Sequence, residues 1–209
     1  MRDLVIVGAG DHGRETLDII EAVNAETPTW NFLGYVDDEP FEPVRGQLPR
    51  GEHLGPTDVM ERLDADYVLG IGTPVVRARL DAQLSDWGRR AATLVHPLAS
   101  CGADNRLADG VLMAAGARVT TNVELGRHVH LNVNAVVSHD GRIGDHVTIS
   151  PGVHVAGRVT VGAGSYLGIG SIVNPGVTIG SDVMIGAGAV VVGDVPDGVT
   201  VKGLPGRWS

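Results

Sequence analysis

Hydrophobic positions in the second half of the chain recur every six residues. From residue 107 to residue 191, each sixth position is Leu, Met, Val or Ile, and the position four residues later is Val or a small residue. Neither an α-helix nor an ordinary amphipathic strand has this period. Short repeats of this kind predict a solenoid, here a triangular prism in which three hexads close one coil and the aliphatic side chains point inward. We expect about five coils, stacked at roughly the 4.8 Å spacing of neighbouring strands.

The first half follows a different pattern, in which short apolar runs alternate with helical segments. Residues 4–7 are wholly apolar, as expected for a strand buried on both faces, and residues 32–36 and 67–72 resemble further strands. Thr57 is placed to cap a short helix that runs through residue 63. Strands that alternate with helices predict a parallel sheet.

Composition fits this division. The chain has 209 residues, of which 30 are Gly and only 4% are aromatic, and a thin prism has no room for rings. Collagen is excluded because there is no Gly-X-Y period, and disorder is excluded by the aliphatic content. We therefore predict an α/β domain with a small Rossmann-like parallel sheet over residues 1–92. A β-solenoid with a short C-terminal tail is predicted over residues 93–209.

Charge and cysteine content narrow the setting of the protein. The net charge of −9 argues against a nucleic-acid-binding surface, which needs a dense basic field. Cys101 is the single cysteine, so no internal disulfide forms and a reducing cytoplasm is expected. It lies six residues before Leu107, so it is predicted to point into the core. No apolar stretch approaches the ~18 residues of a membrane span, and the N-terminus lacks a secretory signal.

A glycine-rich turn follows the first predicted strand. Its sequence is Gly8-Ala9-Gly10-Asp11-His12-Gly13, a G-x-G-x-x-G pattern between a strand and a helix. Amides at a helix start can hold a diphosphate, and glycines let it approach. Asp37, after the second strand, is placed for a ribose or sugar hydroxyl. NAD binding is disfavoured because the domain is too small and no hydride-transfer domain follows; glycines that serve only the turn stay an alternative.

The whole chain resembles a known family. The hexads, the glycine-rich turn, the segment Val136-Val137-Ser138-His139-Asp140 and the tail Val201-Lys202-Gly203-Leu204-Pro205-Gly206 carry the resemblance. They are similar to hexapeptide-repeat acetyltransferases of the bacterial nucleotide-aminosugar N-acetyltransferase and sialic-acid O-acetyltransferase type. The resemblance implies a left-handed β-helix, acetyl-CoA as co-substrate, and a homotrimer that holds the coenzyme between adjacent prisms. It also implies transfer to the amino group of a nucleotide-linked sugar, such as a 4-amino-4,6-dideoxy sugar, in surface-glycan biosynthesis.

His139 is the candidate general base, because an imidazole titrates near neutral pH and can take a proton from an attacking amine. Asp140 follows it and is the candidate orienting carboxylate. Gly157 falls 18 residues later, one coil along on the same face, where its N–H could meet the thioester carbonyl. The resemblance implies substrate contacts at Gly10, Asp11, His12, Gly13, Asp37, Asp38, Gly72, Thr73 and Asn132. It implies coenzyme contacts at Thr148, Gly157, Ile169 and Ala187, although close relatives carry a second histidine where this chain has Thr148.

Three alternatives remain open from the sequence. A sugar O-acetyltransferase would use the same base on a hydroxyl. A zinc site of the γ-carbonic-anhydrase type is suggested by His128 and His146, 18 residues apart, with His130 nearby, but the His-x4-His spacing of that class is absent. We therefore expect no metal and interpret this histidine row as a solvated ladder. A non-catalytic nucleotide-binding protein is the third alternative.

Overall fold

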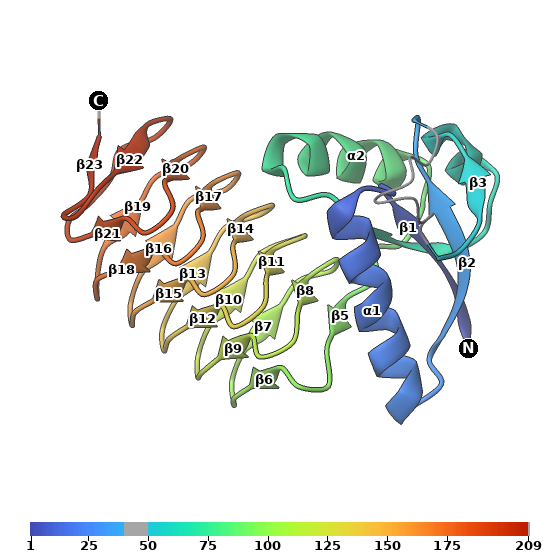
Figure 1. Ribbon diagram of the computed structural model, residues 1–209, viewed down its shortest axis with the longest axis horizontal. Coiled ribbons are helices and arrows are strands. Elements are labelled where there is room, and N and C mark those ends of the chain that lie inside the picture. The colour runs from blue at the N-terminus through green and yellow to red at the C-terminus, as the bar shows by residue number, and fades with distance from the viewer. Residues whose placement is uncertain (40–49, 209) are drawn as a thin grey trace.

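The structure is a computed structural model that describes residues 1–39 and 50–208 (Figure 1). The α/β elements gather at one end of the molecule, and the coils extend away from them toward the C-terminus at the far end. Among the described residues, no helix has the length and apolar character needed to cross a membrane.

The N-terminal domain is built on a parallel four-stranded sheet in the order β3-β2-β1-β4. Its elements are β1 (Arg2–Val7), α1 (Asp11–Glu26), β2 (Trp30–Val36), β3 (His53–Gly55), η1 (Thr57–Glu61), β4 (Asp66–Leu69) and α2 (Pro74–Asp86). Helix α1 and the first coils of the prism cover one face of the sheet, where Ile20 and Leu112 share a core. Helix α2 packs on the other face through Leu80 and Leu84, beside Met60 of η1. The predicted parallel α/β sheet is confirmed.

Two details of this domain differ from the sequence prediction. Thr57 is the first residue of the 3-10 helix η1 and does not cap it; Pro56 takes the N-cap position. The reason is that the Thr57 N–H donates to the Asp38 carboxylate, so another segment supplies the cap. Strand β4 ends at Leu69, which leaves Gly70–Gly72 as an irregular loop before α2.

The α/β elements give way to coils just after α2. The Ala92 N–H donates to the Tyr67 carbonyl at 2.7 Å and so still extends the N-terminal sheet, whereas Leu94 pairs with Leu112 of the prism. The transition from α/β elements to coils therefore lies next to the domain boundary predicted between residues 92 and 93. That boundary stays a prediction.

The prism has three faces, each a parallel sheet of short strands. The face that carries the N-terminal domain, called the docked face, comprises β5 (Leu94–Val95), β8 (Leu112–Met113), β11 (His130–Leu131), β14 (Thr148–Ile149), β17 (Tyr166–Leu167), β20 (Met184–Ile185) and β22 (Thr200–Lys202), with β23 (Arg207–Trp208) antiparallel at its end. The apolar face comprises β6 (Ser100–Cys101), β9 (Arg118–Val119), β12 (Val136–Val137), β15 (His154–Val155), β18 (Ile172–Val173) and β21 (Val190–Val191). The polar face comprises β7 (Arg106–Leu107), β10 (Glu124–Leu125), β13 (Arg142–Ile143), β16 (Thr160–Val161) and β19 (Thr178–Ile179).

The six-residue period forms the core of the prism, as predicted. Residues 18 apart stack in register, for example Leu125 on Ile143. The aliphatic positions from Met113 through Val191 are all buried in one cluster, with Leu107 partly buried at its end. Because each coil covers the one before it, stability is nearly one-dimensional along the prism.

The two ends of the prism depart from this regular pattern. Cys101 is exposed, so its predicted burial is wrong. The reason is that β6 is the first strand of its face, and no coil lies beneath Cys101 to cover it. At the other end, Ile179 pairs with Val195 and Ile185 with Val201, so the last coil is shorter than the 18-residue repeat.

The corners of the prism have a second sequence requirement. Three residues after each inward aliphatic position from 101 to 185, the backbone has a positive φ. Gly, Asn, Asp and His tolerate this left-handed conformation better than other residues, and they occupy these positions except at Arg158. His128, Asp140 and His146 all lie at such corners, with φ of 49°, 61° and 58°.

Candidate active site

His139 lies at the corner where the chain passes from the apolar face to the polar face. Its side chain is half exposed, and Nδ1 lies 2.8 Å from Oδ2 of Asp140. An ionised carboxylate can only accept, so Nδ1 carries the hydrogen and Nε2 keeps its lone pair. The two residues predicted to act together are therefore in contact, in the geometry that a carboxylate-oriented base requires.

Asn122 extends this chain of hydrogen bonds by one coil. Its Nδ2 donates to Oδ1 of Asp140 at 2.7 Å. Hydrogen bonds from His139 and Asn122 hold the pKa of the Asp140 carboxyl below its ordinary value, so this carboxylate is ionised at neutral pH. Asn122 is absent from the predicted site, although it stands 18 residues before Asp140 and the period alone could have indicated it.

Gly157 lies directly beside the His139 ring, one coil along, as predicted. A Cβ atom at this position would come within 2.5 Å of both Cε1 and Nε2 of His139. The His139 ring can therefore lie against this coil only because residue 157 has no side chain.

The other predicted prism residues lie elsewhere. Asn132, Ile169 and Ala187 follow β11, β17 and β20, at the corner between the docked face and the apolar face. Ile169 is 60% exposed, and Ala187 stacks one coil beyond it. They flank the opposite edge of the apolar face from His139, so one chain does not bring them together with it.

Thr148 belongs to a third environment. Its side chain is buried between the docked face and the N-terminal domain, where Oγ1 donates to the Gly72 carbonyl at 2.8 Å. Arg77 Nη2 in turn donates to this hydroxyl at 2.9 Å. This burial argues against a direct coenzyme contact at Thr148.

A pocket of about 350 Å³ opens at the carboxyl ends of β1, β2 and β4, where ligands of parallel α/β sheets bind. The predicted substrate residues in its lining are Gly10, Asp11, His12, Asp37, Asp38 and Gly72. Gly13 and Thr73 are not in the lining. Thr73 instead takes the N-cap position of α2, without a side-chain cap bond.

The glycines of the turn serve different purposes. A Cβ at Gly13 would lie 2.1 Å from the Gly8 carbonyl oxygen, so Gly13 permits close packing of helix on strand. Gly10, the N-cap of α1, has no atom within 4 Å of such a Cβ and faces open space in the pocket. The first amides of α1 lack intrahelical partners, which makes this helix start suitable for an anion.

Four polar side chains around this pocket already have partners in the protein. Asp11 is 91% exposed and pairs with Arg14, so its carboxylate is turned toward solvent. His12 Nε2 lies 3.0 Å from Nδ1 of His130 on the prism. The carboxylates of Asp37 and Asp38 accept from the backbone N–H groups of residues 9 and 57, and so shape the pocket.

A buried polar cluster joins α2 to the docked side of the prism. The Asp81 carboxylate lies 2.9 Å from Nε2 of His128 and 3.0 Å from Nε2 of His146, and it accepts from Arg127 and Tyr67. The rings of His128 and His146 stack at 5.9 Å, as their spacing predicted. The predicted solvated ladder is wrong, because His128 is fully buried beneath the N-terminal domain. The described residues offer no group of three metal ligands.

Burial sets the protonation states in this cluster. Burial alone would raise the pKa of the Asp81 carboxyl, but hydrogen bonds from His128, His146 and Arg127 outweigh it and hold that pKa well below its ordinary value. Desolvation lowers the pKa of His128 and lowers that of His130 further. His128 is therefore neutral at pH 7 and donates through Nε2, while its Nδ1 lies against Gly110 and has no hydrogen-bond partner among the described residues.

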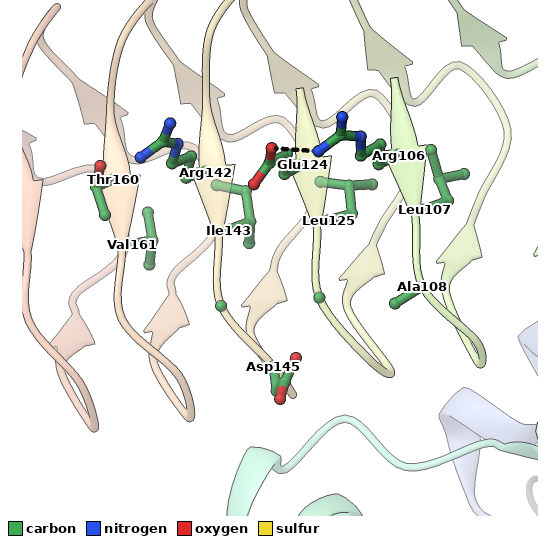
Figure 2. Close-up of a pocket in the computed structure, with 12 residues that line it drawn as sticks. Arg106, Leu107, Ala108, Glu124, Leu125, Arg142, Ile143, Asp145, Thr160 and Val161 are labelled. Carbon is green, nitrogen blue, oxygen red and sulfur yellow. Dashed lines mark hydrogen bonds and ion pairs between the residues drawn. The ribbon is translucent and has the colours of Figure 1, made fainter. Parts of the chain in front are cut away.

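A shallow groove of about 510 Å³ runs along the polar face (Figure 2). Arg106 pairs with Glu124 at 3.3 Å there, and Arg142 stands beside them. Gly126 and Gly144 also line the groove, and a Cβ at either position would meet atoms of the next coil, so these glycines permit close stacking of the coils. No predicted site residue lines it, so the groove belongs to a separate surface.

Comparisons with known proteins agree with both domains. Residues 3–84 match the PglD N-terminal domain, and residues 158–193 match the bacterial transferase hexapeptide. The GDP-perosamine N-acetyltransferase of Escherichia coli O157:H7 is 32% identical over 141 residues, and the match spans 65% of this chain and 61% of that enzyme, less than two thirds of its length.

Solved structures cover the whole chain. The acetyltransferase domain of PglB from Neisseria gonorrhoeae, in complex with acetyl coenzyme A, has a TM-score of 0.91 at 30% identity and covers 100% of this chain and 99% of its own. PerB from Caulobacter crescentus, in complex with CoA and GDP-perosamine, has a TM-score of 0.87 at 33% identity and covers 99% and 97%. These likenesses confirm the predicted class, a small parallel-sheet domain followed by a left-handed β-helix.

Proposed function

The chain belongs to the hexapeptide-repeat sugar N-acetyltransferases, and on this premise we propose that it transfers an acetyl group from acetyl-CoA to the amine of a nucleotide-linked aminosugar. The sugar nitrogen attacks the thioester carbonyl, a C–N bond forms and the C–S bond breaks. The amine proton passes to Nε2 of His139, and CoA leaves as the thiol after protonation. No acyl-enzyme is required.

The observation that carries this proposal is the geometry of His139. Its Nδ1–H is held by Asp140, which is held in turn by Asn122, and the ring lies against Gly157, so in the neutral imidazole Nε2 carries the lone pair that can act as a base. Asp140 is ionised and stabilises the imidazolium that forms on proton transfer. General-base catalysis of this kind contributes roughly 10²–10⁴-fold to a rate.

The nucleotide part of the substrate is assigned to the pocket at the start of α1. The open space at Gly10 and the helix amides suit a diphosphate, and Asp37 lies at the end of β2, where a sugar hydroxyl would bind. The related PerB structure holds CoA and GDP-perosamine, which supports a nucleotide-aminosugar as the substrate class.

We further propose that the active site is completed in a homotrimer. The apolar face and its edges expose Val133, Ile169, Ile172 and Val192 at 44%, 60%, 44% and 54%. Exposed apolar surface of this kind marks an interaction site. In a cyclic assembly, one edge of this face meets the other edge of a neighbour, which would bring Ile169 and Ala187 of one copy near His139 of the next.

A thiol-release assay tests the activity. Acetyl-CoA would be mixed with UDP-, dTDP- and GDP-linked aminosugars, and free thiol would be measured together with the mass of the sugar product. We expect release with at least one acceptor and a gain of one acetyl group on nitrogen. No release with any acceptor, from protein that is folded and trimeric by light scattering, would point to a non-catalytic nucleotide-binding protein.

Matched acceptors separate N-acetylation from O-acetylation. Each active aminosugar would be compared with the analogue that carries a hydroxyl in place of the amine. Turnover that is at least tenfold faster on the amine supports the N-acetyltransferase, and the reverse preference would replace it with the sugar O-acetyltransferase.

A further inference from the structure

Arg77 is fully buried, and its side chain carries a charge. It extends from the first turns of α2 into the contact between the domains. Burial lowers the pKa of Arg77 to about 9, so the guanidinium remains protonated at neutral pH. No carboxylate accepts from it in the part of the chain that the structure describes; its hydrogen bonds go to neutral oxygens.

These oxygens lie on three separate segments. Nε donates to the His128 carbonyl at 3.0 Å, and Nη2 donates to the His146 carbonyl at 2.6 Å, so two successive corners of the prism are held. Nη1 donates to the carbonyls of Ile71 and Gly72 at 2.8 and 3.2 Å, in the loop that follows β4. A planar fork of donors suits such a cross-link, whereas a lysine ammonium cannot reach the same set of oxygens.

The loop held by Arg77 is part of the nucleotide pocket. Ile71 and Gly72 both line the pocket opposite Gly10 and Asp37. The Gly70 N–H donates to the Val7 carbonyl of β1 at 2.8 Å, and residues 71–73 belong to no helix or strand. Thr148 of the prism holds the same loop, because its hydroxyl donates to the Gly72 carbonyl.

Burying a cation without a carboxylate partner costs desolvation free energy, and apolar side chains often stabilise such a contact equally well. The Asp81 cluster already fastens the same two corners through the side chains of His128 and His146. Two polar groups, Arg77 Nη1 and Thr148 Oγ1, nevertheless converge on the Gly72 carbonyl, which stabilising the domain contact does not require.

We propose that Arg77 and Thr148 are positioning residues, which hold the Ile71–Gly72 loop in the shape that binds the nucleotide part of the substrate. The prism thereby sets the affinity of a pocket that lies in the other domain. This inference rests on the proposed function, since it takes that pocket to be the nucleotide site. It also gives Thr148 a role toward the sugar nucleotide in place of the coenzyme.

The test uses the full chain and two ligands measured separately. Kd values for UDP, dTDP and GDP, and for acetyl-CoA, would be measured by calorimetry on wild type, Thr148→Val, Thr148→Ser and Arg77→Lys. Thr160→Val, on the exposed strand β16 of the polar face, is the matched control. Steady-state KM and kcat with the active aminosugar, and Tm, would be recorded for each variant.

We expect Thr148→Val and Arg77→Lys to weaken binding of the diphosphate at least fivefold and to raise the KM of the sugar nucleotide, with the acetyl-CoA Kd within twofold of wild type. Thr148→Ser keeps the hydroxyl and should retain wild-type affinity, as should Thr160→Val. Should Arg77→Lys fail to fold, the two Thr148 variants decide the matter, because their shapes are close to the native one.

Two results would overturn the inference alone. Wild-type diphosphate affinity in Thr148→Val would show that the loop needs no such support, and a weaker acetyl-CoA Kd with an unchanged diphosphate Kd would return Thr148 to the coenzyme site. Wild-type protein that binds none of the three diphosphates would instead overturn the assignment of the pocket, and the inference with it.

Discussion

Two corners of the prism carry histidines, and they serve different ends. At the corner between the apolar and polar faces, His139 is half exposed, with a free Nε2 beside Gly157. At the corner between the polar and docked faces, His128 is fully buried and His146 nearly so, with both Nε2 atoms on Asp81. The first arrangement leaves a nitrogen available for chemistry, and the second uses every Nε2 to fasten the domains together.

The repeat alone does not explain the difference. His139 and His128 occupy neighbouring hexad positions, two and three residues after the inward residues Val137 and Leu125. What differs is the cover: the N-terminal domain packs over His128, whereas the His139 side chain is half exposed. A repeat protein can thus acquire a site at one corner and a domain contact at another, depending on which corner a neighbouring element covers.

The largest effect is expected from a substitution at the exposed corner. His139→Ala should lower kcat by ~10²–10⁴-fold, because it removes the general base, and it should leave Tm unchanged because the ring makes no core contact. The measurement is single-acceptor turnover beside thermal unfolding. Turnover close to wild type would remove His139 from the role of base.

The second largest effect is a loss of stability, expected from a substitution at the buried corner. Asp81→Asn should lower the free energy of unfolding by roughly 3–5 kcal/mol, because it leaves Arg127 and the buried histidines without their carboxylate. Glu124→Gln removes the carboxylate of an exposed pair with Arg106 and is the matched control, for which we expect no resolvable change. Urea unfolding of both variants measures the contrast. Equal effects at the two sites would show that burial does not distinguish them.

A smaller effect is expected from a substitution that tests the role of Gly157. Gly157→Ala should lower kcat/KM about tenfold, or about 1.4 kcal/mol in the barrier, because the new Cβ would lie 2.5 Å from Cε1 and Nε2 of His139 and displace the ring. Gly193 has the same place in its hexad two coils further on, and a Cβ there meets nothing within 4 Å, so Gly193→Ala should leave the kinetics unchanged. Equal kinetics in the two variants would contradict the role of Gly157 in placing the His139 ring.

The smallest effect concerns pH. Burial lowers the folded-state pKa of His128 and His130 below the ordinary value of 6.5, so between those values the unfolded chain binds more protons than the folded one. Stability therefore rises with pH up to about 6.5 and falls on acidification, by about 1 kcal/mol between pH 7.5 and 5.5. The Asp81 carboxyl, with its lowered pKa, loses its contribution only at much lower pH.

Urea midpoints across that range, for wild type and His130→Gln, check the pH prediction. The variant should show a shallower dependence because one buried neutral imidazole is gone. A stability that is flat from pH 7.5 to 5.5 in wild type would contradict it.

Much of the fold followed from local pattern. The period of six predicted the prism because each inward residue packs on residues one coil away, so the requirement repeats along the chain. The position of Gly157 beside His139 followed from the same period, and Asn122 could have been added from it. The pairing of His139 with Asp140 was implied by the family resemblance. The short strand β3 and the early end of β4 could not be predicted, since three or four residues carry too little periodicity to be recognised.

By itself, the sequence determined the prism, the parallel sheet beside it and the corner that holds His139, because these depend on contacts at fixed spacing. The environments of His128, His130, His146 and Thr148 depended on the tertiary structure, because their burial depends on the N-terminal domain. Its helices α1 and α2 lie at least 40 residues away in the chain and have no periodic relation to the repeat. An imidazole or hydroxyl of the repeat is a solvated side chain, a catalytic base or part of a domain contact, depending on which element of the fold covers it. That cover is a long-range contact, which no pattern within the repeat records.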